Sequence, residues 1–168
     1  MKSHGTGSGP WNFSKIGSDV IIENQALVFH PENILIGNNV YIGHQTILKG
    51  YYKNQLIIED GVWIGQQCFL HSAGGIHIEA NVGIGPGVKI LTSNHTDNNP
   101  KIPIMHHQVE MKPVKIGEGS DIGVGAIILP GIELGKGVQV GAGAVVSRSF
   151  PPGSVIAGVP ARIMRTRF

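Results

Sequence analysis

Histidine is the side chain in this sequence best suited to proton transfer, and three of the eight histidines lie in one polar segment. His95, His106 and His107 all fall within residues 92–113, a stretch rich in Asn and Pro. An imidazole has an ordinary pKa of about 6.5, so it can take a proton from a hydroxyl group at neutral pH. This segment therefore holds candidate residues for proton transfer.

A second candidate for chemistry is Cys68, the one cysteine of the chain. It stands where the surrounding pattern repeatedly has a small or apolar residue, so we interpret it as a core residue rather than a nucleophile. We therefore expect no covalent enzyme intermediate. A lone cysteine also excludes an internal disulfide.

The elements that must position these residues follow a period of six. An aliphatic residue, often followed by glycine, recurs every sixth position, and a small or apolar residue follows four positions later. The longest unbroken run is Ile116, Ile122, Ile128, Leu134, Val140 and Val146. This period fits neither a helix nor a simple alternating strand, so we interpret each hexad as one short strand and one corner. We expect the glycine to make the turn, because glycine tolerates unusual backbone angles.

Stacked hexads form a solenoid, and breaks in the repeat mark loops. Short breaks occur at residues 49–55 and 72–75, and the longest is the polar segment 92–113. A long excursion from a regular solenoid is usually functional. Residues 1–15 are expected to be a flexible lead-in to a single domain at residues 16–168.

The pattern resembles the hexapeptide-repeat acyltransferases over about residues 16–168. Its most specific part is the closing segment at residues 150–162, which includes Gly158-Val159-Pro160-Ala161-Arg162. The resemblance implies an all-β fold, a left-handed parallel β-helix with three hexads per coil, one extruded loop (92–113) and a coenzyme-binding tail (158–168). The handedness is implied by the family alone, because general crossover rules favour right-handed connections.

The resemblance also implies an acetyltransferase that uses acetyl-CoA and no metal. In relatives of the galactoside and streptogramin acetyltransferase type, a histidine at the base of the loop is the general base, and His95 matches it. A backbone N–H that stabilises the tetrahedral intermediate matches Val124, and one that contacts the pantetheine matches Ala142. Arg148 and Arg165 match basic positions near the coenzyme phosphates, which suit the forked guanidinium.

In the family the acceptor binds between subunits near the histidine, and the resemblance implies a homotrimer. Short relatives of this kind commonly acetylate sugars, including those of surface polysaccharides, on a hydroxyl or an amine. Asp97 is also a candidate to orient His95. Polar residues expected near the acceptor are Gln67, His71, Asn94, Asp97 and Tyr51.

One position departs from the family. Many relatives carry Trp, packed near the coenzyme or acceptor, where this chain has Asp121. A tryptophan occurs earlier, at Trp63. It is either a surface or trimer-interface aromatic or an acceptor-stacking residue.

Two alternative functions remain open. The same fold hosts γ-class carbonic anhydrases with a three-histidine zinc site, but His71 and His77 do not have the spacing of those ligands. A non-catalytic β-helical scaffold is the second alternative.

Composition excludes other classes. The net charge of +2 gives no argument for nucleic-acid binding. No apolar run is long enough for a membrane span, and the N-terminus lacks the apolar stretch of a signal peptide. We therefore expect a cytoplasmic protein without membrane insertion.

Overall fold

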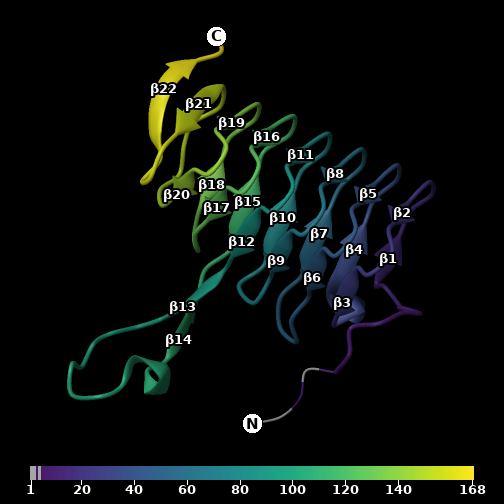
Figure 1. The fold of residues 1–168 in the computed structure, drawn as a ribbon, viewed down its shortest axis with the longest axis horizontal. Coiled ribbons are helices and arrows are strands. Elements are labelled where there is room, and N and C mark those ends of the chain that lie inside the picture. The colour runs from purple at the N-terminus through teal and green to yellow at the C-terminus, as the bar shows by residue number, and fades with distance from the viewer. Residues whose placement is uncertain (1–2, 4) are drawn as a thin grey trace.

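The computed structural model describes residue 3 and residues 5–168, and its main body is a prism of three parallel sheets (Figure 1). Sheet A contains β1 (Lys15–Ile16), β4 (Ile34–Ile36), β7 (Leu56–Ile58), β10 (Ile76–Ile78), β15 (Val114–Ile116) and β18 (Glu133–Leu134). Sheet B contains β2 (Ile21–Ile22), β5 (Tyr41–Ile42), β8 (Trp63–Ile64), β11 (Gly83–Ile84), β16 (Asp121–Ile122), β19 (Gln139–Val140), β21 (Ser154–Ala157) and β22 (Arg162–Thr166). Sheet C contains β3 (Leu27–Phe29), β6 (Ile47–Lys49), β9 (Phe69–His71), β12 (Lys89–Leu91), β17 (Ile127–Ile128) and β20 (Val145–Val146).

The chain visits sheets A, B and C in turn, so each coil has an A–B, a B–C and a C–A corner. About seven coils stack in this way, which confirms the solenoid of hexads expected from the sequence. Inside the prism, the aliphatic residue of most hexads is buried, as Ile42, Leu48 and Ile64 illustrate, whereas Ile16 in the first coil is 49% exposed. Each such side chain contributes about 1.5–3 kcal/mol through burial, largely offset by the entropy of ordering the chain.

The expected role of the glycine after each aliphatic residue was wrong. The left-handed residue at the B–C corner stands two positions later, as in Gln45 (φ 60°) and Gly125 (φ 68°). Gly123 itself does not have a positive φ; a Cβ there would lie 2.6 Å from the backbone nitrogen of Ala142. This glycine is therefore required because successive coils approach closely, not because the chain turns at it.

Both ends of the prism are covered. At the first end, Trp11 and Phe13 pack against the core, and Gly7 O accepts a hydrogen bond from Val28 N at 2.8 Å. The lead-in that we expected to be flexible therefore makes specific contacts, although residues 1, 2 and 4 lie outside the described part. At the other end, β22 runs antiparallel to β21 and completes sheet B.

The segment between β12 and β15 leaves the prism as a hairpin. β13 (Ser93–His95) pairs antiparallel with β14 (Val109–Met111), and a short 3₁₀ helix, η2 (Ile104–His106), lies in the excursion between them. Figure 1 shows this hairpin projecting away from the C–A corner. A second 3₁₀ helix, η1 (Pro31–Asn33), follows β3. Across the described residues, none of the helices has the length and apolar character that a bilayer span needs.

Candidate active site

The hairpin is anchored to the prism by Thr92, which is fully buried. Its hydroxyl donates to His71 O at 2.6 Å and accepts from Gly74 N at 2.8 Å, and its carbonyl accepts from Lys112 N at 2.9 Å. A Cβ at Gly74 would lie 2.7 Å from both Lys112 N and Thr92 O. The glycine insertion at residues 74–75 therefore makes room for the two strands of the hairpin to leave the coil.

His95 is the last residue of β13 and is half-buried. Its Nδ1 lies 3.2 Å from the carbonyl oxygen of His107. A carbonyl can only accept a hydrogen bond, so this contact places the ring proton on Nδ1 and leaves the lone pair on Nε2. The imidazole is thereby held in the tautomer that a general base requires.

His107 orders the far part of the hairpin with its side chain. Its Nε2 lies 3.1 Å from Asn99 O and 3.2 Å from Ile102 O. The same residue thus orients His95 through its carbonyl and ties down residues 99–102 through its ring. Within the described chain, the partner of the His95 ring is this carbonyl and not Asp97, which is exposed.

Three of the expected acceptor residues lie at or near the C–A corner. Tyr51 and His71 meet edge to face with ring centroids 6.0 Å apart, and His71 also stacks on Phe69. Asn94 is exposed on β13, where its amide donates to His95 O at 3.1 Å. The aromatic pair is fixed to the base of the hairpin because the carbonyl of His71 accepts from Thr92.

Val124 and Ala142 lie one above the other at the B–C corner. Val124 O accepts from Gly143 N at 2.8 Å, and Val124 is 57% exposed. The N–H groups of Val124 and Ala142 donate to no acceptor among the described residues. Pro86 holds the equivalent place one coil earlier and has no N–H. Val124 and Ala142 therefore present two neighbouring free donors beyond Pro86. Within the described chain, His44 and Gln66 present equivalent free donors before it.

Carboxylates occupy the A–B corner instead. Asp60 accepts from Asn38 N at 2.7 Å, and Glu79 accepts from Glu118 N at 2.9 Å and pairs with Lys115 at 2.8 Å. The backbone N–H of Asn38 lowers the pKa of Asp60, and the Lys115 ammonium, followed by the N–H of Glu118, lowers the pKa of Glu79. At this corner the N–H groups of Asn38 and Glu118 are thus capped by carboxylates, whereas those of Val124 and Ala142 at the B–C corner are open.

The remaining expected residues are dispersed. Gln67 lies at the B–C corner, where its amide donates to Gln45 at 3.0 Å. Arg148 follows β20 and lies over the ring of Phe150 at 5.1 Å, and Arg165 is exposed on β22. Cys68 is buried, and burial raises the pKa of its thiol. The thiol therefore has little thiolate character, as expected for a core residue.

His95 and Val124 do not meet within one chain. They belong to different corners, C–A and B–C, and sheet C lies between these corners. The strand β17 and its flanking residues span on the order of 15 Å at about 3.3 Å per residue. A site that uses both residues must therefore take them from two subunits.

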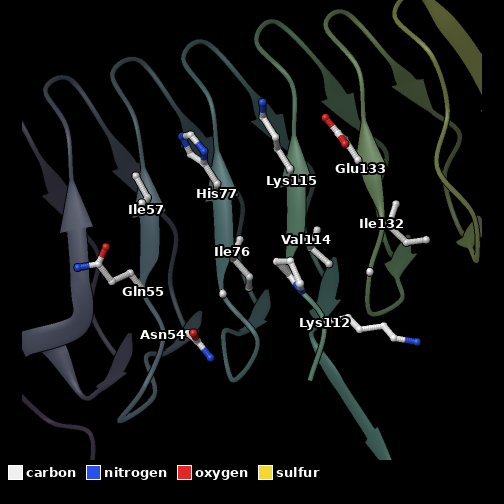
Figure 2. Close-up of a pocket in the computed structure, with 13 residues that line it drawn as sticks. Asn54, Gln55, Ile57, Ile76, His77, Lys112, Val114, Lys115, Ile132 and Glu133 are labelled. Carbon is white, nitrogen blue, oxygen red and sulfur yellow. The ribbon is translucent and has the colours of Figure 1, made fainter. Parts of the chain in front are cut away.

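A groove of about 580 Å³ lies on sheet A beside the base of the hairpin (Figure 2). Its floor is apolar, with Ile57, Ile76 and Ile132. Two of its polar side chains already have partners: His77 lies 2.6 Å from Glu59, and Lys115 pairs with Glu79. None of the residues expected to act in catalysis or coenzyme binding lines it.

Comparison with known proteins identifies the family. The model of a family described as the hexapeptide repeat of succinyl-transferase matches residues 55–91 and 113–148, so it skips the projecting hairpin. WcaF of Escherichia coli (strain K12), an acetyltransferase provisionally assigned to colanic acid biosynthesis, is 30% identical over 132 residues, which is 79% of this chain and 69% of that protein. The chain belongs to the hexapeptide-repeat acyltransferases.

Other hexapeptide-repeat relatives have a higher sequence identity to this chain or match a larger part of it. Nodulation protein L of Rhizobium meliloti (strain 1021) is 43% identical over 112 residues, or 67% of this chain, but the match spans 60% of that relative. The N-acyltransferase AntD of Bacillus cereus, solved with dTDP and 3-hydroxybutyryl-CoA, superposes with a TM-score of 0.83 at 27% identity over 93% of this chain and 84% of that chain. A galactoside acetyltransferase solved with coenzyme A gives a TM-score of 0.65 at 25% identity, over 92% of this chain and 65% of that chain.

These relatives confirm the prediction of a hexapeptide-repeat acyltransferase and favour it over the carbonic anhydrase alternative. In the described part of the chain, His, Cys, Asp and Glu form no cluster of three that could hold a metal ion.

Sequence reasoning missed three positioning residues: Thr92, Gly74 and His107. The two-residue insertion around Gly74 was a signal visible in the sequence, because it interrupts the hexad. In the structure it faces the point where the hairpin leaves the coil. The pairing of the His107 carbonyl with His95 had no signal, because a backbone group carries no residue identity.

Proposed function

We propose that this protein transfers an acetyl group from acetyl-CoA to a hydroxyl or amine of a sugar. His95 is the general base, and the acyl group passes directly from the thioester to the acceptor. A thioester is already activated, so the enzyme needs to remove a proton from the acceptor and to stabilise the oxyanion. The observation that carries the proposal is the pair of open N–H groups at Val124 and Ala142, with an imidazole of defined tautomer on the hairpin.

The coenzyme is assigned to the B–C corner. The Val124 N–H is positioned to donate to the developing oxyanion of the thioester, and the Ala142 N–H, one coil on, to a pantetheine carbonyl. Arg148 and Arg165 lie in and beyond the sixth coil, at the end of the prism where the coenzyme phosphates would then fall. The direction of the coenzyme follows, with phosphates toward β22 and thioester toward β11.

The active site is shared between subunits of a homotrimer. Ile104 and Met105 on the hairpin are 62% and 75% exposed. Apolar side chains at the tip of an arm indicate a contact with a neighbouring molecule. The hairpin of one subunit then brings His95 to the B–C corner of the next, which removes the separation of the two groups within one chain.

A sugar is the proposed acceptor class. Tyr51, His71, Asn94, Asp97 and Gln67 supply polar and aromatic contacts suited to a hydroxyl-rich ring. Named relatives act on such molecules, among them a galactoside O-acetyltransferase and a dTDP-4-amino-4,6-dideoxy-D-glucose acyltransferase, both from Escherichia coli.

The proposal is tested by incubating the protein with acetyl-CoA and a panel of glycosides, nucleotide sugars and aminoglycosides, with release of free thiol as the readout. We expect acceptor-dependent thiol release that is lost in His95→Ala. Calorimetry with coenzyme A is the second measurement. Absence of coenzyme binding by intact protein would favour the scaffold alternative.

A further inference from the structure

We propose that Trp63, Gly83 and Asp121 form a slot on sheet B that receives the pyranose ring of the acceptor. The inference rests on the proposed acetyltransferase function and names specificity-determining residues for it. The three residues are register partners on neighbouring strands β8, β11 and β16, so they follow one another along a single outward-facing column.

One wall of the slot is the Trp63 indole. It stacks on Tyr41 with ring centroids 5.6 Å apart and an interplanar angle of 8°, so one face of the indole is covered from the N-terminal side. Trp63 is nevertheless 42% exposed. The stack holds the indole in a fixed orientation, with its other face toward the next coil.

The floor of the slot is Gly83, which leaves that face uncovered. A Cβ at Gly83 would meet no atom within 4 Å except Asp121 Oδ1 at 3.2 Å, and Gly83 does not have a positive φ. Neither packing nor backbone conformation therefore requires a glycine here, unlike at Gly123. The missing side chain creates space rather than relieving a clash.

The far wall is the Asp121 carboxylate. No hydrogen bond or ion pair engages it within the part of the chain that the structure describes. Strands in a sheet lie about 4.8 Å apart, so roughly 9.6 Å separates the backbones of Trp63 and Asp121. A ring stacked on the indole can then place its hydroxyl or amino groups against the carboxylate.

The charge of Asp121 and the order of the proposed sites along the prism favour a sugar, rather than the coenzyme, as the occupant of the slot. A carboxylate accepts hydrogen bonds and repels phosphate. The proposed coenzyme contacts run from Ala142 in the sixth coil (β18–β20) to Val124 in the fifth (β15–β17). The slot lies beside them on sheet B and extends from Asp121 in the fifth coil to Gly83 in the fourth and Trp63 in the third. The acceptor would thus lie beyond the thioester, at the end opposite Arg148 and Arg165.

The test uses Trp63 fluorescence in a Trp11→Phe background, since these are the two tryptophans of the chain. Probes are methyl β-galactoside, methyl α-glucoside and dTDP-4-amino-4,6-dideoxyglucose, with thymidine and coenzyme A for comparison. We expect a saturable change with at least one sugar. Gly83→Val fills the slot, and its Cβ requires a small shift of the Asp121 side chain alone. It should weaken that affinity by about tenfold, a typical loss for an aromatic contact.

Gln139→Val is the matched control, because it changes the next residue of the same column outside the slot. It should leave sugar affinity unchanged, and calorimetric affinity for coenzyme A should be unchanged in both variants. In otherwise native protein, Gly83→Val should raise the KM for the acceptor and not the KM for acetyl-CoA.

Four results would overturn the slot. In the fluorescence test, these are no change with any sugar probe, or a change with thymidine alone. In the variants, they are normal sugar affinity of Gly83→Val, or dissociation of the oligomer by Trp63→Ala without a change in sugar affinity. The last would make Trp63 an interface residue. Failure of the unsubstituted protein to bind coenzyme A is a separate outcome, which contradicts the proposed function rather than the slot.

Discussion

The two nitrogens of His95 have different tasks. Nδ1 is held by the carbonyl of His107, which lies between η2 and β14, while Nε2 stays available for a proton. A carbonyl fixes the tautomer without adding a negative charge beside the ring. The ring is therefore oriented with Nε2 free to act as a base.

We predict that His95→Ala lowers kcat by about 10²–10⁴-fold, the usual contribution of a general base. Coenzyme A affinity should change little, because the proposed coenzyme contacts lie at another corner. Steady-state thiol release and calorimetry measure the two quantities. Turnover equal to that of the unsubstituted protein would remove His95 from the mechanism.

We predict that Cys68→Ala retains full kcat, because the thiol is buried and its pKa is raised. The same variant should lose about 1 kcal/mol of unfolding free energy through the small cavity it creates. Turnover and denaturant unfolding check both parts. Loss of turnover in a folded variant would instead indicate an acyl-cysteine intermediate.

At the scale of the elements, substitutions at two glycines of the B–C corner should differ in their effect on stability. Gly123→Ala places a Cβ 2.6 Å from Ala142 N and should destabilise the fold by about 1–3 kcal/mol, as overpacking does. Gly125→Asn is the control: it has open space and a φ of 68°, which Asn tolerates and already adopts at Asn39 and Asn81. Equal losses in thermal unfolding would contradict the close-approach role.

The A–B corner should confer stability that depends on pH. The pKa of Glu79 is lowered from 4.5 by Lys115 and the Glu118 N–H, so its charged form favours the folded state. This stabilisation is present above the unfolded pKa and is lost as pH falls through the lowered folded pKa. Glu79→Gln should therefore lower Tm at pH 7 and match the parent in strong acid. A Tm difference that persisted in acid would point to packing instead.

The sequence predicted the elements better than their contacts. The hexad located the buried residues of sheets A, B and C, because inward and outward positions recur with a fixed period. It misassigned the glycine, since a turn and a close approach both favour that residue. The hairpin at residues 92–113 was recognised as an excursion, but the pairing of Asn94 with Glu110 depends on packing that no period records.

For the whole molecule, the proposed function makes one chain half of a site. The prism fixes Val124 and Ala142 on one corner and sends His95 out from another, so a mechanism that uses all three requires assembly to bring them together. The interface between such subunits is heterologous, because one uses its hairpin and the other its B–C corner. Sites of this kind can be rebuilt from two inactive variants.

We predict that co-expressing His95→Ala with Ala142→Glu restores activity that neither variant has alone. Ala142 is exposed, so the glutamate should block the coenzyme corner without unfolding the prism. With random mixing, a native hairpin meets a native corner in ½ × ½ of the interfaces, so specific activity should reach about one quarter of the parent value. Variants mixed after separate folding, without subunit exchange, are the control. If co-expression restores nothing although light scattering confirms mixed trimers, then His95 and Val124 do not act across a subunit interface, and the shared active site is wrong.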